Sequence, residues 1–462
     1  MSAVDFLPCL LWVMVSRYST EARCMAGDVQ NVGPVVLQTG VRKFNFWTFM
    51  YASFICIAML AGMNFLQIYL LEVNLSVPKD QQGFVTGLLA TYTEIVAILL
   101  IIPFGVLADR VGRRPVLVSG LVLCGIGYGL FSIASTINEL VVYRIIFAIG
   151  AAALSAMIPT IGNDYTQEKS RGRLFGFSGV MNGFGVIFMS AGLAQIPAML
   201  SGRGFGPEQA GMGMFLTAAV LCLISAVVFR FGLQPGVPDD VQTATRPPLK
   251  QMLSGGVRAA RNPRIVLSYL AAFAGRSDNA IKGLFLSAWV IQVAPAADMT
   301  VTDAMARAGQ LMAVMGAVTL VWMPLFGYLL DRLNRVTGMA LAMLLAAAGY
   351  ISMGLITSPL DNAMLPAFVL LAIGQGSAII ASVTLVGQEA SAAERGTIIA
   401  TNGWFGAVGI LIASLAGGIL FDRIGPSAPF VMIGVFQVFV FLFALLVRFN
   451  APGMQAKDKF AR

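Results

Sequence analysis

Long apolar runs alternate with short polar breaks from Phe46 to Arg448. A run of about 20 apolar residues is long enough, as an α-helix, to cross the ~30 Å hydrocarbon core of a bilayer. The pattern therefore predicts an all-α integral membrane protein with twelve transmembrane helices. The predicted spans are residues 46–72, 83–108, 114–135, 139–162, 172–197, 211–233, 264–293, 305–330, 336–357, 363–387, 396–420 and 427–448.

The longest internal break, residues 234–263, divides these runs into six and six. It carries several prolines and basic residues, which suits a cytoplasmic linker between two bodies that move against each other. The sequence thus predicts six-helix bundles at residues 45–233 and 264–448. Residues 1–44 and 449–462 are predicted to be cytoplasmic tails.

The amino-terminal tail shows no pattern that predicts a fold. Residues Phe6–Val15 are apolar but too few to span a bilayer, and Pro8 lies among them. No basic region and small-residue cleavage site frame this stretch as a signal peptide. Met25 is an alternative start of the chain.

The composition agrees with a membrane protein. Hydrophobic residues make up 58% of the chain and charged residues 11%, against about 25% charged in soluble proteins. The net charge of +8 could suggest a nucleic-acid partner. Most Lys and Arg residues, however, fall in loops and tails on one side of the predicted membrane, as the positive-inside rule requires of the cytoplasmic side. We therefore expect a monomer in a lipid bilayer, in the bacterial inner (cell) membrane, with both termini cytoplasmic and no nucleic-acid partner.

Cysteine and histidine usage narrows the chemistry. The five cysteines have no metal-binding spacing and no paired loop positions, so we expect them to be unpaired and expect no metal site. The chain has no histidine. A proton carried by a side chain near neutral pH must therefore travel on a carboxylate.

One polar break has a distinctive sequence. Residues 105–115 read Gly-Val-Leu-Ala-Asp-Arg-Val-Gly-Arg-Arg-Pro between two apolar runs, which predicts a tight hairpin. This resembles the signature loop between the second and third helices of the major facilitator superfamily: glycine, a leucine two positions on, aspartate, arginine, glycine and two basic residues. A weaker copy at residues 327–335 has Asn334 for the second glycine and has lost one basic residue.

A second match indicates that the two halves are repeats. Residues 148–150, Ala-Ile-Gly, are followed by Thr160 and by Arg-Gly at 171–172. The same residues recur without a gap at 372–374, at Thr384 and at Arg395-Gly396. Repeated halves are common in transporters. Together with the hairpin, they identify the chain as resembling the superfamily, which implies two pseudo-symmetric six-helix bundles around a central cavity.

The resemblance also implies a cytoplasmic gate. In the superfamily, the aspartate equivalent to Asp109 meets the start of a helix in the other half, here near residues 394–396, and a nearby arginine, here Arg113, orients it. The alternative is that these charges only set the topology and turn the chain. The predicted gate residues are Gly105, Asp109, Arg110, Gly112, Arg113, Asp331 and Arg335.

Five ionisable groups fall inside predicted spans: Glu94, Arg144, Arg276, Asp278 and Lys282. A charge at mid-helix costs roughly 2.5–3.5 kcal/mol on insertion scales, so such residues usually line a bundle interior or a wet cavity. Glu94, about 22 Å along its helix from Asp109, is a candidate proton carrier. The alternative is a permanent pair with an arginine.

Arg144 begins Arg-Ile-Ile-Phe-Ala-Ile-Gly, which resembles the superfamily's fourth-helix pattern with Ala148 in place of its first glycine. Its counterpart in the second half is Phe368. A purely architectural residue should more often survive duplication. We therefore favour a substrate or proton role for Arg144 over a fixed ion pair with Glu94.

The seventh span carries three charges. Asp278 and Lys282, at i and i+4, share one helix face and are predicted to form an intrahelical pair. Asp278 is also the second candidate proton carrier. Arg276 points about 160° away from the pair and is predicted to be a free cation for an anionic substrate group. Alternatively Arg276 pairs with Glu94, which would leave Arg144 near the outer surface in water.

Uncharged polar residues complete the predicted site. In the superfamily the first, fourth, seventh and tenth helices line the cavity, so Asn64, Gln67 and Gln375 are candidate substrate-binding residues, with Asn402 in the eleventh span. Polar groups in membrane helices also hold bundles together, so some of these are expected to be packing residues.

No Gly-x-x-x-x-Gly-Lys-Ser/Thr loop is present, so an ion gradient rather than ATP is the expected energy source. The favoured function is a proton-coupled secondary transporter, symporter or antiporter, for a small organic solute, with an anionic solute preferred. Alternatives are a proton-driven exporter of drugs or hydrophobic compounds and a non-transporting sensor or receptor. No nucleophile-and-base set or metal cluster is visible, so we expect neither an enzyme nor a cofactor.

Overall fold

A computed structural model describes residues 30–235, 258–389 and 395–452. Twelve helices in these residues are long and apolar enough to cross a membrane, as the sequence predicts. The first six spans are α2 (Lys43–Val73), α3 (Gln82–Val111), α4 (Arg113–Phe131), α5 (Ile137–Tyr165), α6 (Arg171–Ala191) with η3 (Leu193–Gln195) and α7 (Ile196–Ser201), and α8 (Pro207–Gly232). The other six are α10 (Pro263–Val293), α11 (Val301–Arg332), α12 (Arg335–Ser352), α13 (Leu365–Glu389), α14 (Arg395–Arg423) and α15 (Ala428–Asn450).

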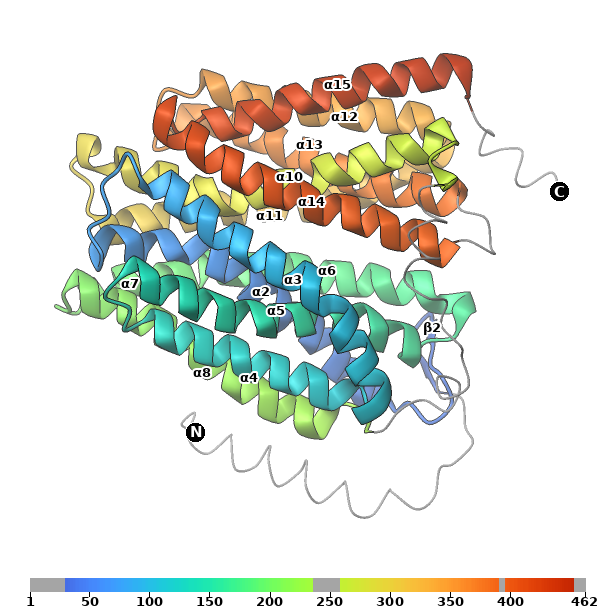
Figure 1. The fold of residues 1–462 in the computed structure, drawn as a ribbon, viewed down its shortest axis with the longest axis horizontal. Coiled ribbons are helices and arrows are strands. Elements are labelled where there is room, and N and C mark those ends of the chain that lie inside the picture. The colour runs from blue at the N-terminus through green and yellow to red at the C-terminus, as the bar shows by residue number, and fades with distance from the viewer. Residues whose placement is uncertain (1–29, 236–257, 390–394, 453–462) are drawn as a thin grey trace.

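The helices form two bundles, α2–α8 and α10–α15, which lie one above the other in Figure 1. Short 3-10 turns join or extend several of them: η2 (Glu168–Ser170), η5 (Ala294–Ala297), η6 (Met353–Leu355) and η7 (Asn362–Met364). The fifth span differs from the single predicted run, because the α-helix stops at Ala191 and resumes at Ile196.

The repeated glycines have the same structural role in both bundles. A Cβ on Gly150 would lie 2.4 Å from the carbonyl oxygen of Gly120, and one on Gly374 would lie 2.6 Å from that of Leu345. Real Cβ atoms never approach this closely, so only glycine permits these crossings of α5 with α4 and of α13 with α12. The repeat seen in the sequence is therefore a repeat of close helix packing.

The prediction that the amino-terminal tail has no fold is wrong for residues 30–42. Strands β1 (Asn31–Val32) and β2 (Val35–Val36) form a hairpin, and Leu37 bridges to Thr166 after α5. Val35 and Leu37 are fully buried. The apolar residues here are too few to show a periodic pattern, yet enough to cover the ends of α5 and α6.

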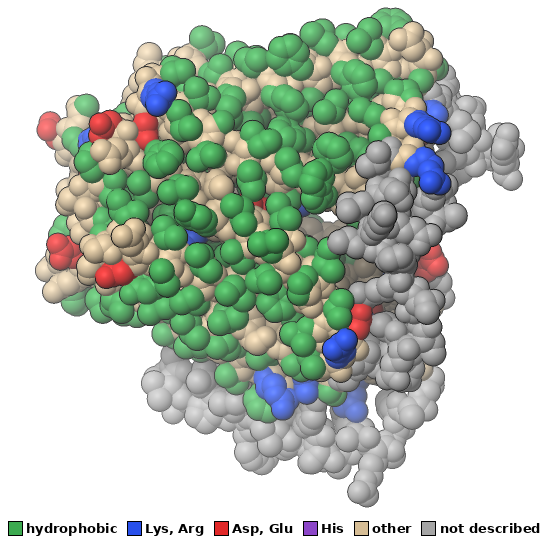
Figure 2. Space-filling model, viewed as in Figure 1, with side chains coloured by type: hydrophobic (Ala, Val, Ile, Leu, Met, Phe, Trp, Pro, Cys, Tyr) green, Lys and Arg blue, Asp and Glu red, His purple; other side chains and the backbone are tan. Residues whose placement is uncertain are grey.

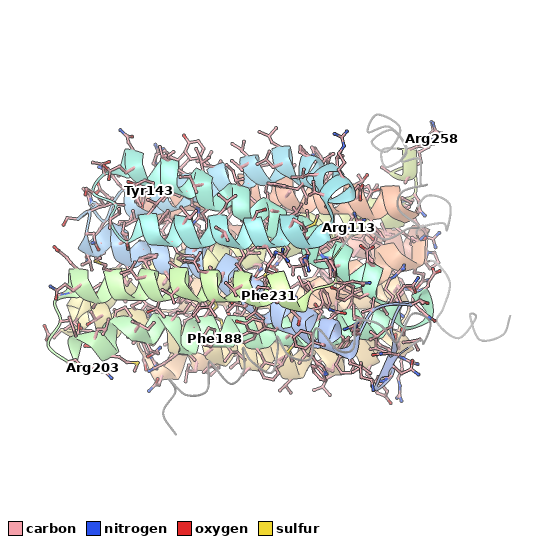
Figure 3. The ribbon with its side chains drawn as sticks, turned by 90° about the horizontal axis from the view of Figure 1, so that it is seen from below. Arg113, Tyr143, Phe188, Arg203, Phe231 and Arg258 are labelled. Carbon is pink, nitrogen blue, oxygen red and sulfur yellow. The ribbon has the colours of Figure 1, made fainter. Side chains whose placement is uncertain are left out.

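The two ends of the bundles differ. We call them the Asp109 end and the Asp422 end; in the first bundle Arg113 lies at the former and Arg203 at the latter (Figure 3). At the Asp422 end, the carboxylate of Asp422 on α14 accepts hydrogen bonds from the backbone N–H groups of Gly83 (2.8 Å) and Phe84 (2.7 Å) at the start of α3. Further hydrogen bonds join the bundles in this half of the molecule, between Lys79 and Gln292, Ser287 and Phe65, and Gln195 and Ala306.

Toward the Asp109 end, side chains of α3 and α14 are more exposed. Leu99 and Ile102 on α3 are 66% and 49% exposed, and Trp404 on α14 is 48% exposed. Figure 2 shows a hollow between the two bundles on this side, with charged side chains visible inside it. Among the described residues, the bundles are therefore joined at the Asp422 end and separate toward the Asp109 end.

Candidate functional site

Glu94 lies midway along α3, on the seam between the bundles, and is half-buried. The charges that act on it come from both halves: Arg276 on α10 and Arg144 on α5. Among the residues the structure describes, Glu94 makes no ion pair. Its carboxylate is therefore influenced by two cations but forms an ion pair with neither in the described residues.

Arg144 is fully buried in the first bundle. Its guanidinium donates to the hydroxyl of Thr93 (2.7 Å), to the side-chain oxygen of Gln67 (3.2 Å) and to that of Asn64. It also lies 5.5 Å from the centre of the Phe147 ring, a cation–π distance. The structure thus brings three predicted site residues from α2 and α5 together, with Thr93 as a partner that the sequence analysis missed.

Two alternatives for Arg144 are wrong in this structure. It forms no ion pair with Glu94 in the described part of the chain, and it is not near the surface in water. Neutral oxygens satisfy the guanidinium instead, which is possible because its planar fork offers five donors to several acceptors at once. Gln67 is only 1% exposed, so it serves Arg144 rather than lining an open cavity.

Arg276 is exposed, unlike Arg144. Its guanidinium donates to the carbonyl oxygen of Gly403 on α14 (3.3 Å), and a Cβ on Gly406 would lie 2.2 Å from its side chain. The glycines of α14 therefore make room for the arginine to lie across that helix. Next to Gly403, the side-chain oxygen of Asn402 is buried and has no hydrogen-bond partner in the described ranges.

Asp278 and Lys282 differ from the predicted pair. Both are buried, but within the described residues they form no direct ion pair. Asp278 accepts from the amide of Gln437 (3.2 Å), whereas Lys282 donates to the side-chain oxygen of Gln375. Gln375, predicted to line the cavity, is 1% exposed and donates to Asn279 (3.2 Å). Each charged group is thus hydrogen-bonded to an amide of another helix, Asp278 to one on α15 and Lys282 to one on α13.

Arg113, one of the predicted gate residues, is buried at the start of α4. It pairs with Asp109 (2.7 Å) and with Asp164 on α5 (2.9 Å), and it donates to the carbonyl oxygen of Ala108 (2.8 Å). Gly112 has φ +94°, a conformation that favours glycine and allows the tight turn between α3 and α4.

The other gate residues are more open. Arg110 is exposed and Gly105 half-buried on α3. In the second bundle Asp331 and Arg335 form an ion pair of 2.9 Å. Residue 394, near which Asp109 is predicted to dock, lies outside the described residues.

Three of the five cysteines lie among the described residues. Cys56, Cys124 and Cys222 are free and buried, whereas Cys9 and Cys24 lie outside the described residues. Across residues 30–235, 258–389 and 395–452, no group of three or more acidic or cysteine side chains is arranged to hold a metal ion.

The fold consists of two six-helix bundles that are joined at one end and separate toward the other. Glu94 and Arg276 lie between the bundles without an ion pair in the described residues. These features are typical of a membrane carrier. The model of the Major Facilitator Superfamily matches residues 49–365 and 283–462. The chain belongs to this superfamily, as its hairpin and repeat predict. The family and its solved neighbours are transporters.

Magnetosome proteins match along most of this chain. The chain is 29% identical over 403 residues to magnetosome protein MamH of Paramagnetospirillum magneticum, covering 85% of this chain and 90% of MamH. It is 26% identical over 412 residues to magnetosome protein MamZ of Magnetospirillum gryphiswaldense, of which it spans 61%, against 86% of this chain. A shorter match, 34% identical over 155 residues, is to the class H tetracycline resistance protein of Pasteurella multocida, with 32% of this chain and 34% of that protein covered.

Solved structures agree on the fold. The nucleoside transporter NupG superposes with a TM-score of 0.67 at 14% identity, covering 87% of this chain and 99% of NupG. A bacterial homologue of the lysosomal transporter Spinster, in an inward-facing occupied conformation, has a TM-score of 0.65 at 17% identity, covering 89% and 98%. Identities this low show the shared fold alone.

Proposed function

We propose that this chain is a proton-coupled secondary transporter that moves a small organic solute with an anionic group by alternating access. The observation that carries the proposal is the position of Glu94. It stands on the seam between Arg144 of one bundle and Arg276 of the other, without an ion pair in the described part of the chain. A group whose neighbours belong to different bundles changes its environment when the bundles move.

Proton coupling follows from that change. A carboxylate in a membrane protein is ionised where water or a cation reaches it and neutral where neither does. Rocking of the two bundles alters the distance from Glu94 to Arg276 but not to Arg144, because Arg144 sits in the same bundle. Asp278 is the second candidate carrier, but it is fully buried inside one bundle.

Arg276 is the better candidate for binding the solute. Its guanidinium is exposed, whereas the Arg144 guanidinium is buried and bonded to three side chains. We assign Arg144 the task of holding Asn64 and Gln67 in place, and Arg276 the task of meeting the anionic group.

The gate at the Asp109 end completes the cycle. If positively charged loops mark the cytoplasmic side, this structure is open to the cytoplasm. Arg113 then holds Asp109 ready to meet the start of α14 when that end closes. The ion pair of Asp331 with Arg335 is the counterpart in the second bundle.

The test of proton coupling works before the solute is identified. Purified protein in proteoliposomes is adsorbed on a solid-supported membrane, and the charge displaced by a pH jump is recorded. We expect a transient in wild type and its loss in Glu94→Gln. Wild-type transients in both Glu94→Gln and Asp278→Asn would exclude both residues as carriers. Solutes are then identified by counterflow from a panel of metabolite anions, sugars and organic cations.

An exporter of hydrophobic compounds is the second candidate. It is favoured by an apolar pocket of about 400 Å³ lined by Ala317, Val318, Val321, Trp322 and Ile373, and by the partial likeness to a tetracycline resistance protein. This function predicts that tetracycline quenches Trp322 fluorescence and stimulates the pH-jump current. A sensor or receptor, by contrast, would bind a solute without counterflow.

A further inference from the structure

Asn279 is an exposed polar residue on α10, three positions after Arg276. Residues three apart on a helix are neighbours on one face, with Cβ atoms roughly 5–6 Å apart. Within its own bundle α10 packs mainly against α11, α13, α14 and α15, and across the seam it contacts α2 and α3 of the other bundle. Exposed side chains near the middle of α10 therefore face the space between the bundles.

A hydrogen bond orients the side-chain amide of Asn279. Lys282 is buried and, as an ammonium group, can only donate hydrogen bonds, so its bond to Gln375 requires the oxygen of that amide. The nitrogen of Gln375 must then face the other way, where it donates to the side-chain oxygen of Asn279 (3.2 Å).

With its oxygen engaged inward, Asn279 presents its N–H donors outward. We propose that Asn279 is a second binding residue for an oxyanion, beside Arg276, and that Lys282 and Gln375 are positioning residues which keep its amide in the donor orientation. The inference rests on the proposed transport function and narrows it to a solute bearing a carboxylate or phosphate group. Adjacent guanidinium and amide donors suit such a group, which accepts several hydrogen bonds at once.

The first experiment tests the orientation of the amide. Asn279→Asp keeps the oxygen that accepts from Gln375, whereas Asn279→Leu removes it. Each is combined with Gln375→Leu, and the midpoint of thermal unfolding is measured for all of them. We expect Gln375→Leu to lower the midpoint more in wild type and in the Asn279→Asp chain than in the Asn279→Leu chain. An equal effect in the Asp and Leu chains would overturn the orientation.

The second experiment tests the preference for anions in the folded full-length protein. A cysteine replaces Gly283, where an added Cβ meets no atom within 4 Å, and the five native cysteines are replaced by alanine. Labelling rates are compared for an anionic and a cationic methanethiosulfonate reagent. Glu94→Gln is included so that its charge does not offset that of Arg276.

At low salt the ratio of the anionic to the cationic labelling rate should be about four-fold higher with Arg276 than in Arg276→Gln, because a unit charge lies ~10.5 Å away along the helix in a water-like dielectric. Asn279→Asp should lower the ratio, whereas Arg332→Gln, at the helix end of α11, should leave it unchanged. A ratio that Arg276→Gln does not alter would overturn the proposal.

Slower labelling in phosphate than in chloride at equal ionic strength would assign a tetrahedral oxyanion, and slower labelling in acetate a planar one. No protection by either anion would count against the site. Labelling does not require transport. The anion preference can therefore be absent while the proton-driven current persists, and the current can be absent while the anion preference is observed.

Discussion

The hydrogen bonds of Asp422 to the start of α3 exist only while the Asp422 end is closed, since the acid and the helix belong to different bundles. Charge-assisted hydrogen bonds contribute roughly 1.5–3 kcal/mol each. Because Asp422 is half-buried, we take the lower value. Asp422→Ala, which removes both bonds, should therefore favour opening of this end by about 3 kcal/mol, on the order of 100-fold in the equilibrium.

Asp422→Asn should have a smaller effect. Asparagine keeps one acceptor oxygen but loses the charge and the second bond, so a shift of roughly 5–30-fold, or about 1–2 kcal/mol, is expected. The ordering of wild type, Asn and Ala separates a hydrogen-bonding role from a general loss of packing. A damaged fold would be recognised by a lower unfolding temperature in both variants.

The assay uses Ser414, which is fully buried where α14 meets α3. Ser414→Cys should react with a membrane-impermeant maleimide only when the Asp422 end opens. We expect the labelling rate to rise from wild type to Asp422→Asn to Asp422→Ala. Asp80→Asn, an exposed acid at the same end, is the matched control. Equal labelling of Asp422→Ala and the Asp80→Asn control would refute the reasoning.

Three further outcomes are expected. Gly150→Ala should destabilise the protein by about 1–3 kcal/mol through overpacking, whereas Gly387→Ala, with no atom within 4 Å of its added Cβ, should be neutral or stabilising; thermal unfolding in detergent compares them. Arg144→Lys should reduce the pH-jump current at least about ten-fold at unchanged expression, because a point charge cannot replace a guanidinium fork. Val35→Ala should cost about 1–3 kcal/mol, seen as faster proteolysis near the hairpin; cleavage at the wild-type rate would make the hairpin dispensable.

Much of the fold could be predicted from the sequence because a bilayer imposes a length and a polarity on each span. The twelve spans and the repeat of Gly150 at Gly374 are local signals that do not depend on which helices are neighbours. The hairpin at residues 31–36 was missed for the opposite reason. Its strands have two residues each, and burial against the ends of α5 and α6 stabilises them rather than any pattern of their own.

The sequence could predict which residues belong to the candidate site but not which of them interact with each other. A charged residue inside an apolar span is visible in the sequence, so Glu94, Arg144 and Arg276 could be chosen without a structure. Which group meets which depends on helix rotation and on neighbours distant in the chain. Thr93 and Asp164 were therefore missed as partners of Arg144 and Arg113.

The same limit explains why the predicted ion pair in the seventh span is not formed. Spacing at i and i+4 predicts a direct contact between Asp278 and Lys282 if both side chains lie on an uncovered face. In the structure the face is covered, and amides from two other helices take the place of that contact. Pair spacing on one helix cannot reveal side chains that arrive from another helix.

The glycines at the Asp422 end have a consequence for how closely the two bundles can approach. A Cβ on Gly87 would lie 2.2 Å from the backbone oxygen of Ser414, and one on Gly309 would lie 2.2 Å from that of Ser190. Main chain thus meets main chain across the seam, and even a methyl group at either position would hold the bundles apart. The closed form of this end therefore depends on two positions at which the chain carries no side chain.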